Sequence, residues 1–572
     1  MFDKLNKVEQ SVFDLLSLFL VLFYSYSAVL EPAATQYHRG IYVIVTYVLV
    51  FLLYQSKTRL GRLIDYLLIA LSIISIGYWI TNFEVINYRA GAETTLDKSI
   101  AVVGVLIGVE LARRVVGSVF VIIGGVMLLY GVFGEYAPEL ISHAGDTFPD
   151  LCTSIFYKSD GVFGIMANVL ATYIVLFVIF GAFLEKSGAQ RFFINFPLAA
   201  VGHKIGGPGK VSVIASGLFG SISGSAIANT VSTGAFTIPM MKKAGFRPHI
   251  AGGIEPAASI GGMFMPPIMG AGGFIMAELT GVPYSQIMLV AVFPALMYFF
   301  SVFVMVHYEA KKHNIVGERS KVSAMEILRR EWFYVLPLVT ITIFMLAGYS
   351  PGYSAILGVL TCIAVSWVRV DTRIGLKGFM EASRAGAESS LKIGATVGVI
   401  GIIIGVLTYS GLVLTFADIV IELADGRLFL TIVLIALASL VLGMGVPVTA
   451  AYLITAVVAV PALTHLGVNE IAAHMIVYWL SQDSNITPPV CIAAFAGATI
   501  AKANMWKTAF TAFKFAKFLY LGPFLFGYVP GFTLNGSSTD ILVAFVLIFF
   551  ATWAYSWLLS GIWLNWFNKK AA

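Results

Sequence analysis

Residues 219–230 concentrate glycine, serine and asparagine inside strongly apolar sequence, and Pro239 follows them. Serine competes for backbone hydrogen bonds and glycine costs about 1 kcal/mol against alanine, so residues 221–225 should interrupt a helix. Unwound backbone inside a membrane is tolerated only where it lines a cavity or is buried in protein. From residue 226 onward a helix can restart, and its free N–H groups would favour an anion.

A second stretch of the same kind lies 222 positions further along the chain, where residues 442–449 are again rich in glycine and strongly apolar. Several residues in and after the first stretch are identical to the residues 222 positions further along the chain, and no gap is needed to align them. The pairs are Ala228 and Ala450, Pro239 and Pro461, Ser259 and Ser481, Pro266-Pro267 and Pro488-Pro489, and Ala271 and Ala493. Paired interrupted hydrophobic segments in two halves of a chain indicate the binding site of a transporter.

Three ionisable residues lie in or near these segments. Asp483 is the most informative, because an ionisable group inside a membrane segment is costly and usually functional. It could bind a cation, carry a coupling proton, or accept hydrogen bonds that hold the break open. Glu255 lies close to one end of its segment, and we interpret it as an interface residue or gate element. We interpret His474 as a packed polar residue.

The composition places these segments in a polytopic membrane protein. Of the 572 residues, 59% are hydrophobic and 12% are charged, and the mean hydropathy is +0.89. Apolar runs long enough to cross a bilayer recur throughout the chain. The three cysteines have no metal-like spacing, and a net charge of +6 requires no nucleic-acid partner.

The hydropathy pattern predicts an all-α fold with two inverted-topology repeats, each with a re-entrant helical hairpin and a broken transmembrane helix. We expect an N-terminal helical scaffold (1–135), a periplasmic connection (136–163), a first repeat (164–308) with hairpin 212–240, cytoplasmic arm segments with two connecting spans (309–392), a second repeat (393–531) with hairpin 428–464, and an extra span with a cytoplasmic tail (532–572). The scaffold spans are expected near 12–30, 40–54, 64–81, 99–112 and 115–134. The broken spans are expected at 249–278 and 470–500, and 369–392 is interpreted as a basic surface segment.

Because Cys152 lies in the periplasmic connection, we expect it to react with impermeant thiol reagents from outside.

The distribution of basic residues supports this topology. With the N-terminus inside and both hairpins re-entrant, nearly all of the 36 Lys and Arg residues fall on the cytoplasmic side. The exceptions are Arg39, Arg89, Lys98, Lys158 and Arg427. This asymmetry is what the positive-inside rule requires, and it predicts cytoplasmic N- and C-termini.

Three segments resemble the large membrane subunit of the TRAP transporters (tripartite ATP-independent periplasmic transporters): residues 220–229, 238–245 and 258–271. Residues 443–447 and 483–489 resemble the TAXI class of that family, in which the small and large membrane subunits are commonly fused. The resemblance implies an elevator-type permease of the bacterial inner membrane. It would take a small organic anion, usually a carboxylate, from a periplasmic TAXI-type binding protein and couple uptake to an ion gradient.

The predicted tips and breaks contain no Lys or Arg, so helix N-termini and polar side chains should hold a substrate carboxylate. The candidates for this role are Ser223, Ser225, Asn229, Thr449 and Asn485. Carbonyl, hydroxyl and carboxylate oxygens are also suitable ligands for Na⁺. The candidate cation ligands are Gly224, Ser225, Asn229, Ser259, Gly261, Gly262, Gly443, Gly445, Thr449, Ser481, Asp483, Ser484, Asn485 and Thr487.

The coupling ion is therefore expected to be Na⁺, with H⁺ as the alternative, and at least two cations should accompany a carboxylate substrate. No catalytic residue and no organic cofactor is expected. A channel built from re-entrant hairpins and a secondary anion transporter without a binding protein remain alternatives. An intramembrane serine protease is disfavoured, because the spacing around Ser223-Gly224 is one residue too long.

Overall fold

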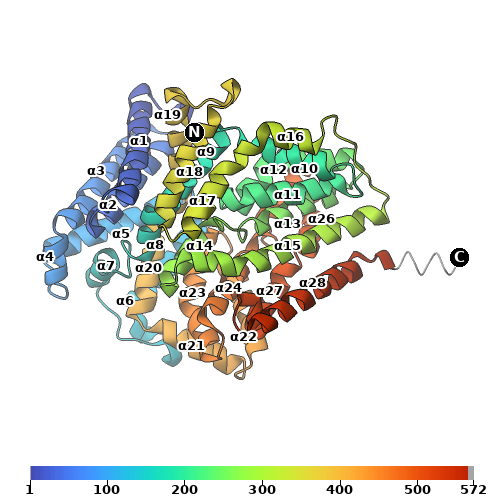
Figure 1. The fold of residues 1–572 in the computed structure, drawn as a ribbon. Helices are drawn as coiled ribbons and strands as arrows, with labels where there is room; N and C mark the ends of the chain where they lie inside the picture. Colours follow the sequence, from blue (N-terminus) through green and yellow to red (C-terminus); the bar gives the residue numbers. More distant parts are fainter. Residues whose placement is uncertain (1, 564–572) are drawn as a thin grey trace.

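The computed structural model describes residues 2–563, and these form an all-helical protein (Figure 1). Nine helices in this range are long and apolar enough to cross a membrane. The only β-contact in the range is a single bridge between Ile205 and Val316. The predicted fold class, an all-α polytopic membrane protein, is confirmed. The predicted cytoplasmic tail ends at Lys569-Lys570, which lies outside the described residues.

The N-terminal part begins with helices that match the predicted spans. They are α1 (Lys7–Val29), α2 (Thr35–Leu53), α3 (Arg59–Thr81), α5 (Thr95–Val115) and α6 (Ser118–Val132). Two shorter helices were not predicted, α4 (Phe83–Tyr88) and α7 (Phe148–Tyr157). Both are too short for a hydropathy pattern to detect.

Local capping explains where several of these helices begin. α1 starts with a capping box between Asn6 and Glu9, and α5 starts with one between Thr94 and Asp97. In such a box each residue satisfies a backbone N–H that the first helical turn leaves free. α28 (Ser538–Ser560), the last described helix, begins in the same way.

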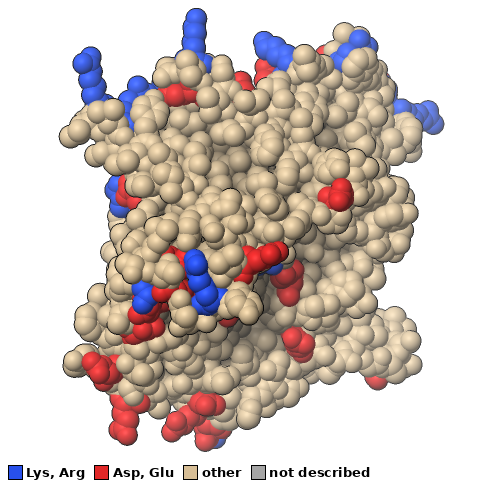
Figure 2. Space-filling view, turned by 90° about the vertical axis from the view of Figure 1, so that its left-hand side faces the viewer, with Lys and Arg blue, Asp and Glu red and all other residues tan. Residues whose placement is uncertain are grey.

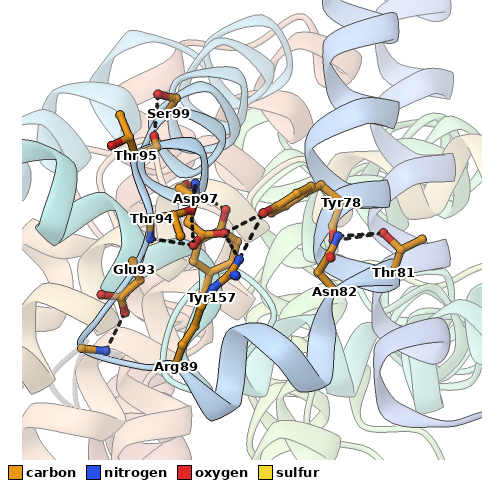
Figure 3. A network of polar contacts seen from close by, with 11 residues as sticks. Tyr78, Thr81, Asn82, Arg89, Glu93, Thr94, Thr95, Asp97, Ser99 and Tyr157 are labelled. Atoms are coloured by element: carbon orange, nitrogen blue, oxygen red, sulfur yellow. Dashed lines mark hydrogen bonds and ion pairs between the residues drawn. The ribbon is translucent and has the colours of Figure 1, made fainter.

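A polar network closes one end of the N-terminal helices (Figure 3). The Asp97 carboxylate accepts hydrogen bonds from the Tyr78 hydroxyl at 2.7 Å and from Arg89 at 2.5 Å. The Tyr157 hydroxyl donates to the Asp97 carbonyl at 2.8 Å. Burial disfavours the charged carboxylate, but the hydrogen bonds from Tyr78, Thr94 and Arg89 outweigh it and lower the pKa of Asp97. The network joins α3, α4, α5 and α7.

Cys152 does not behave as predicted. It lies in α7, and its side chain is fully buried. α7 packs against α5 and α20 (Val397–Tyr409), and the Cys152 side chain has no exposed surface. The prediction that Cys152 reacts with impermeant reagents is therefore wrong, because a polar connection can still fold back onto the helices that it joins.

The first repeat region contains two hairpin arms and a broken helix. Its helices are α8 (Ile165–Val169), α9 (Val175–Lys186), α10 (Ala189–Val201), α11 (Gly207–Ser223), α12 (Ala226–Lys243), α13 (Pro248–Gly261), α14 (Gly270–Thr280) and α15 (Tyr284–Lys312). A π-helical turn, Leu170–Ile174, joins α8 to α9. We call α11 and α12 hairpin 1, and residues 262–269 break 1.

The second region repeats this order. Its helices are α20, α21 (Leu412–Leu423), α22 (Leu428–Leu442), α23 (Val448–His465), α24 (Glu470–Leu480), α25 (Ile492–Ala501), α26 (Met505–Phe515) and α27 (Phe518–Tyr528). We call α22 and α23 hairpin 2, and residues 481–491 break 2. Break 2 contains a 3₁₀ turn, Asp483–Asn485.

Helix boundaries in the two regions differ by the same 222 positions as the sequence pairs. α12, α13 and α14 begin at residues 226, 248 and 270, and α23, α24 and α25 begin at 448, 470 and 492. Met269 and Cys491, which precede α14 and α25, both adopt the left-handed conformation. Figure 1 shows hairpin 1 in the upper half of the molecule and hairpin 2 in the lower half.

The segment between the two regions contains α16 (Ala324–Glu331), α17 (Leu336–Leu346), α18 (Pro351–Ser366) and α19 (Leu376–Gly394). The description of 369–392 as a surface segment needs a correction. α19 packs against α1 and α9 and buries Ala382, Gly386 and Leu391. Arg384 binds both carboxylate oxygens of Asp14 on α1, at 2.6 and 2.7 Å. The basic residues lie on one face of the helix only, which residue composition does not reveal.

Short 3₁₀ turns complete the described chain: Phe2–Lys4, Gly134–Tyr136, Glu139–Ile141, Trp332–Val335, Val370–Thr372 and Pro530–Thr533.

Candidate functional site

The tip of hairpin 1 is formed by Gly224 and Ser225. Gly224 ends α11 in the left-handed conformation, with φ of +60°. The hydroxyl of Ser225 caps α12 by accepting a hydrogen bond of 3.3 Å from the Ala228 N–H. A Cβ placed on Gly224 would lie 3.5 Å from the Cα of Gly270, so the tip touches the start of α14. Ser223 lies beside it, with its hydroxyl 3.5 Å from the Ser225 carbonyl.

Asn229 connects hairpin 1 to α13. Its side chain is fully buried, and its amide nitrogen donates to the carbonyl of Ser216 at 2.9 Å and to that of Ser259 at 3.5 Å. Next to it, α11 and α13 approach backbone to backbone: a Cβ on Gly220 would lie 2.9 Å from the Cα of Gly262. The structure therefore brings together the predicted residues Asn229, Ser259 and Gly262.

Gly261 lies beside this contact and faces away from the tip. A Cβ on Gly261 would lie 2.6 Å from the ring of Tyr298. Only the backbone of Gly261 can therefore contribute to a site, and a backbone carbonyl is the ligand that the sequence analysis expected there.

The tip of hairpin 2 meets break 2. A Cβ on Gly443 would lie 2.5 Å from the Ser484 hydroxyl, which leaves no room for a larger residue. Asp483, Ser484 and Asn485 are all buried, and the amide of Asn485 donates to the Gln482 carbonyl at 3.2 Å. The structure thus brings Gly443 next to Ser484, which is flanked along the chain by Asp483 and Asn485.

Three other predicted ligands, Gly445, Ser481 and Thr487, do not direct a free side-chain oxygen toward the group around Ser484. Gly445 is exposed, and a Cβ on it would lie 3.3 Å from Val119 of α6, so it faces the N-terminal helices. The Ser481 hydroxyl donates to the Tyr478 carbonyl of its own helix at 2.7 Å. Thr487 is half-buried, and its hydroxyl lies 2.6 Å from that of Tyr520. The hydroxyls of Ser481 and Thr487 are engaged elsewhere and Gly445 has no side chain, so only the backbone carbonyls of these three residues could bind an ion.

Several buried polar atoms near hairpin 2 and break 2 have no hydrogen-bond partner within residues 2–563. They are Ser439 Oγ, Thr449 Oγ1, Thr455 Oγ1, Gln482 Oε1 and Nε2, and Asp483 Oδ1. Buried polar atoms are nearly always paired in native proteins, so a group of unpaired atoms at one place is a candidate site for a ligand or for bound water. Most of these atoms are oxygens, which suits a hard cation such as Na⁺.

Break 1 packs against α24, the helix that precedes break 2. The Tyr478 hydroxyl on α24 donates to the carbonyls of Met263 and Met269 in break 1, at 2.7 and 2.5 Å. Phe264 stacks on Trp479 with 4.3 Å between ring centroids. The two polar clusters therefore belong to one packed unit.

Sequence reasoning misjudged or missed several residues. Glu255 does not lie at an interface: it is fully buried between α11, α12 and α13. Its distance along the chain from the helix end suggested exposure, but hairpin 1 covers it. Gln482 was missed, although its position beside Asp483 could have revealed it. The interpretation of His474 agrees with the structure, in which it is buried at 2.9 Å from the Tyr452 hydroxyl.

Comparison with known proteins identifies relatives of the chain. The profile of the family described as "Tripartite ATP-independent periplasmic transporter, DctM component" matches residues 103–532. The sialic acid TRAP transporter large permease protein SiaM of Vibrio cholerae is 23% identical over 346 residues, which cover 60% of this chain and 80% of SiaM. The C4-dicarboxylate TRAP transporter large permease protein DctM of Rhodobacter capsulatus is 32% identical over 136 residues, which cover 22% of this chain and 31% of DctM.

Among solved structures, the crystal structure of the YdaH transporter of Alcanivorax borkumensis aligns with 75% of this chain and 98% of its own. The identity is 17%, and the TM-score is 0.44.

Proposed function

Because the chain belongs to the DctM family of TRAP transporter permeases, we propose that it imports a small organic anion by cation-coupled symport. The observation that carries this proposal is the pairing of two helix-hairpin tips with two broken helices around buried oxygen atoms. Such a site suits an anion at the helix N-termini and cations at the oxygens. Relatives described as permeases for sialic acid and C4-dicarboxylates support a carboxylate as the substrate.

The substrate carboxylate would contact Ser223, Ser225, Asn229, Thr449 and Asn485. Na⁺ would be held by the oxygen ligands of the two clusters and would neutralise the charge of the substrate. The side chains of Asn229, Ser259, Thr449 and Asp483 and the backbone of Gly224, Gly262 and Gly443 suit this role best. H⁺ remains the alternative coupling ion, and Asp483 is the residue of this set that could carry it.

The proposed partner is a periplasmic solute-binding protein of the TAXI type, and the proposed location is the bacterial inner membrane. Figure 2 shows Lys and Arg along the upper edge of the molecule and Asp and Glu at the lower end. This separation supports a cytoplasmic upper side and a cytoplasmic N-terminus. Hairpin 1 would then enter from the cytoplasm and hairpin 2 from the periplasm, as in an inverted repeat with elevator motion.

Reconstitution tests this function. The purified permease in liposomes, together with a TAXI-type solute-binding protein, should accumulate radiolabelled succinate or sialic acid when an inward Na⁺ gradient is imposed. Accumulation without the binding protein would favour the alternative secondary transporter. Rapid equilibration that never exceeds the outside concentration would favour a channel.

A further inference from the structure

Glu255 lies between the two arms of hairpin 1, and four hydroxyl groups donate to its carboxylate. Ser212 and Ser216 belong to α11, and Thr233 and Thr237 belong to α12. Residues of each pair are four positions apart, so both hydroxyls lie on the same face of their helix. The single carboxylate therefore ties both arms of the hairpin to α13.

The surroundings satisfy the Glu255 carboxyl group with hydrogen bonds alone. An ionised carboxylate only accepts hydrogen bonds and has about four lone-pair sites, which the four hydroxyls use. Within residues 2–563 it forms no ion pair. Nearby basic groups are engaged elsewhere: Lys210 Nζ lies 3.0 Å from His307 Nδ1, and Lys242 Nζ donates to the Ala501 carbonyl at 2.8 Å.

The remaining acidic, basic and histidine side chains on the helices packed against α13, and on α13 itself, also leave Glu255 without an ion pair. They are Lys243, His249, Glu309, Lys311, Lys312, Lys507 and Lys514. A buried charge without a counter-charge is strongly unfavourable, so the Glu255 carboxylate requires either a proton or a nearby cation.

The network continues from Glu255 to candidate cation ligands. Thr233 Oγ1 also lies 2.7 Å from the Asn229 carbonyl and 3.4 Å from the Asn229 side-chain oxygen. The Ser259 hydroxyl lies 3.5 Å from the Glu255 carboxylate. Because the amide nitrogen of Asn229 donates to the Ser216 carbonyl, its amide oxygen is the atom left for a cation.

We propose that Glu255 is the positioning residue, and the fixed negative charge, of a monovalent cation site in the first repeat region. It acts through Asn229 and Ser259, which would contact the ion. The inference rests on the proposed Na⁺-coupled transport. The shift of 222 positions carries Glu255 onto Val477 and Asp483 back onto Gly261, so these two buried acids occupy non-equivalent positions of the repeat. Two buried acids provide for two cations.

Na⁺-dependent thermal unfolding of the purified full chain in detergent tests this proposal without transport. Choline chloride would keep the ionic strength constant. The wild-type melting temperature should rise with Na⁺, with a Hill slope near two. Glu255→Gln keeps the shape but removes the charge, so the slope should fall toward one and the Na⁺ midpoint should rise about tenfold. Its melting temperature without Na⁺ should stay equal to wild type or rise, which a loss of structural support would not produce.

Glu309→Gln is the matched control, because Glu309 is a buried acid on α15 that lies 3.3 Å from His313. It should keep the wild-type Na⁺ dependence. If Glu255→Gln also keeps it, the role of Glu255 is refuted while Na⁺ coupling stands. If wild type itself does not respond to Na⁺, the Na⁺ coupling under the proposed function fails, and the cation site fails with it.

Thr237→Val covers the case in which Glu255→Gln does not fold. It removes one hydroxyl donor to Glu255 and lies outside the candidate ligands. Its Na⁺ midpoint should rise several-fold, and an unchanged midpoint would overturn the proposal.

Discussion

The contact between Gly220 and Gly262 lets us predict how much stability the protein loses when α11 and α13 are forced apart. Gly262 has a right-handed helical conformation, with φ of −60°, so alanine there meets no backbone penalty. Its Cβ, however, would lie 2.6 Å from the backbone carbonyl carbon of Gly220. Backbone cannot move aside as a flexible side chain can. Gly262→Ala should therefore force α11 and α13 apart and destabilise the protein by about 1–3 kcal/mol, the usual cost of overpacking.

Gly77→Ala in α3 is the matched control, because a Cβ there would meet nothing within 4 Å. In a helix this change should be neutral or stabilising by up to about 1 kcal/mol. Equilibrium unfolding in mixed micelles would measure both variants, and uptake by liposomes would show whether the altered hairpin still transports. If Gly262→Ala is as stable and as active as wild type, the close approach of α11 and α13 is not a feature of the working protein.

Other expected outcomes concern ligands, topology and pH. Asn229→Val and Thr449→Val should each weaken Na⁺ or substrate binding about tenfold or more, with membrane insertion unchanged; wild-type uptake at low Na⁺ and low substrate would exclude them from the site. Asp483→Asn should alter the Na⁺ dependence of uptake, whereas full uptake without Na⁺ that follows an imposed pH gradient would establish H⁺ as the coupling ion. In a chain without native cysteines, a cysteine at exposed Ser142 should react with an impermeant thiol reagent from the periplasm and one at Lys242 should not; labelling at 242 would contradict the re-entrant hairpin. Because the pKa of Asp97 is lowered in the folded protein, its contribution to stability is present above its unfolded value, near 4, and is lost as the pH falls through the folded pKa; Asp97→Asn should flatten the acid limb of a plot of stability against pH, measured by thermal unfolding.

Local sequence features were sufficient to locate the hairpins and the breaks. Glycine and serine weaken a helix and an N-cap sets where it restarts, so the tip at Gly224-Ser225 could be predicted without knowledge of its neighbours, although Ser221 and Ser223, expected in the interruption, remain helical. The repeat could also be predicted from the sequence, because residue pairs 222 positions apart correspond to helices that begin 222 positions apart. These features depend only on residues a few positions apart.

Contacts between distant segments could not be predicted in this way. Gly443 and Gly445 lie two positions apart in the same glycine-rich tip, and the sequence does not distinguish them. In the structure Gly443 faces Ser484, whereas Gly445 faces Val119 of α6. Cys152 lies in a polar connection and is nevertheless buried. In both cases the outcome depends on which helix packs against the segment.

The amino-acid sequence by itself determined the membrane class, the helical architecture and the positions of the two interrupted hairpins, because hydropathy and helix breaking are local properties. Only the tertiary structure decided which polar groups meet inside the protein. Glu255 shows the difference most clearly: its four hydroxyl partners lie 18 to 43 positions away on two other helices. No spacing rule links those residues. They meet because packing the apolar faces of α11, α12 and α13 together leaves one common polar position between them, and burial there makes each hydrogen bond obligatory.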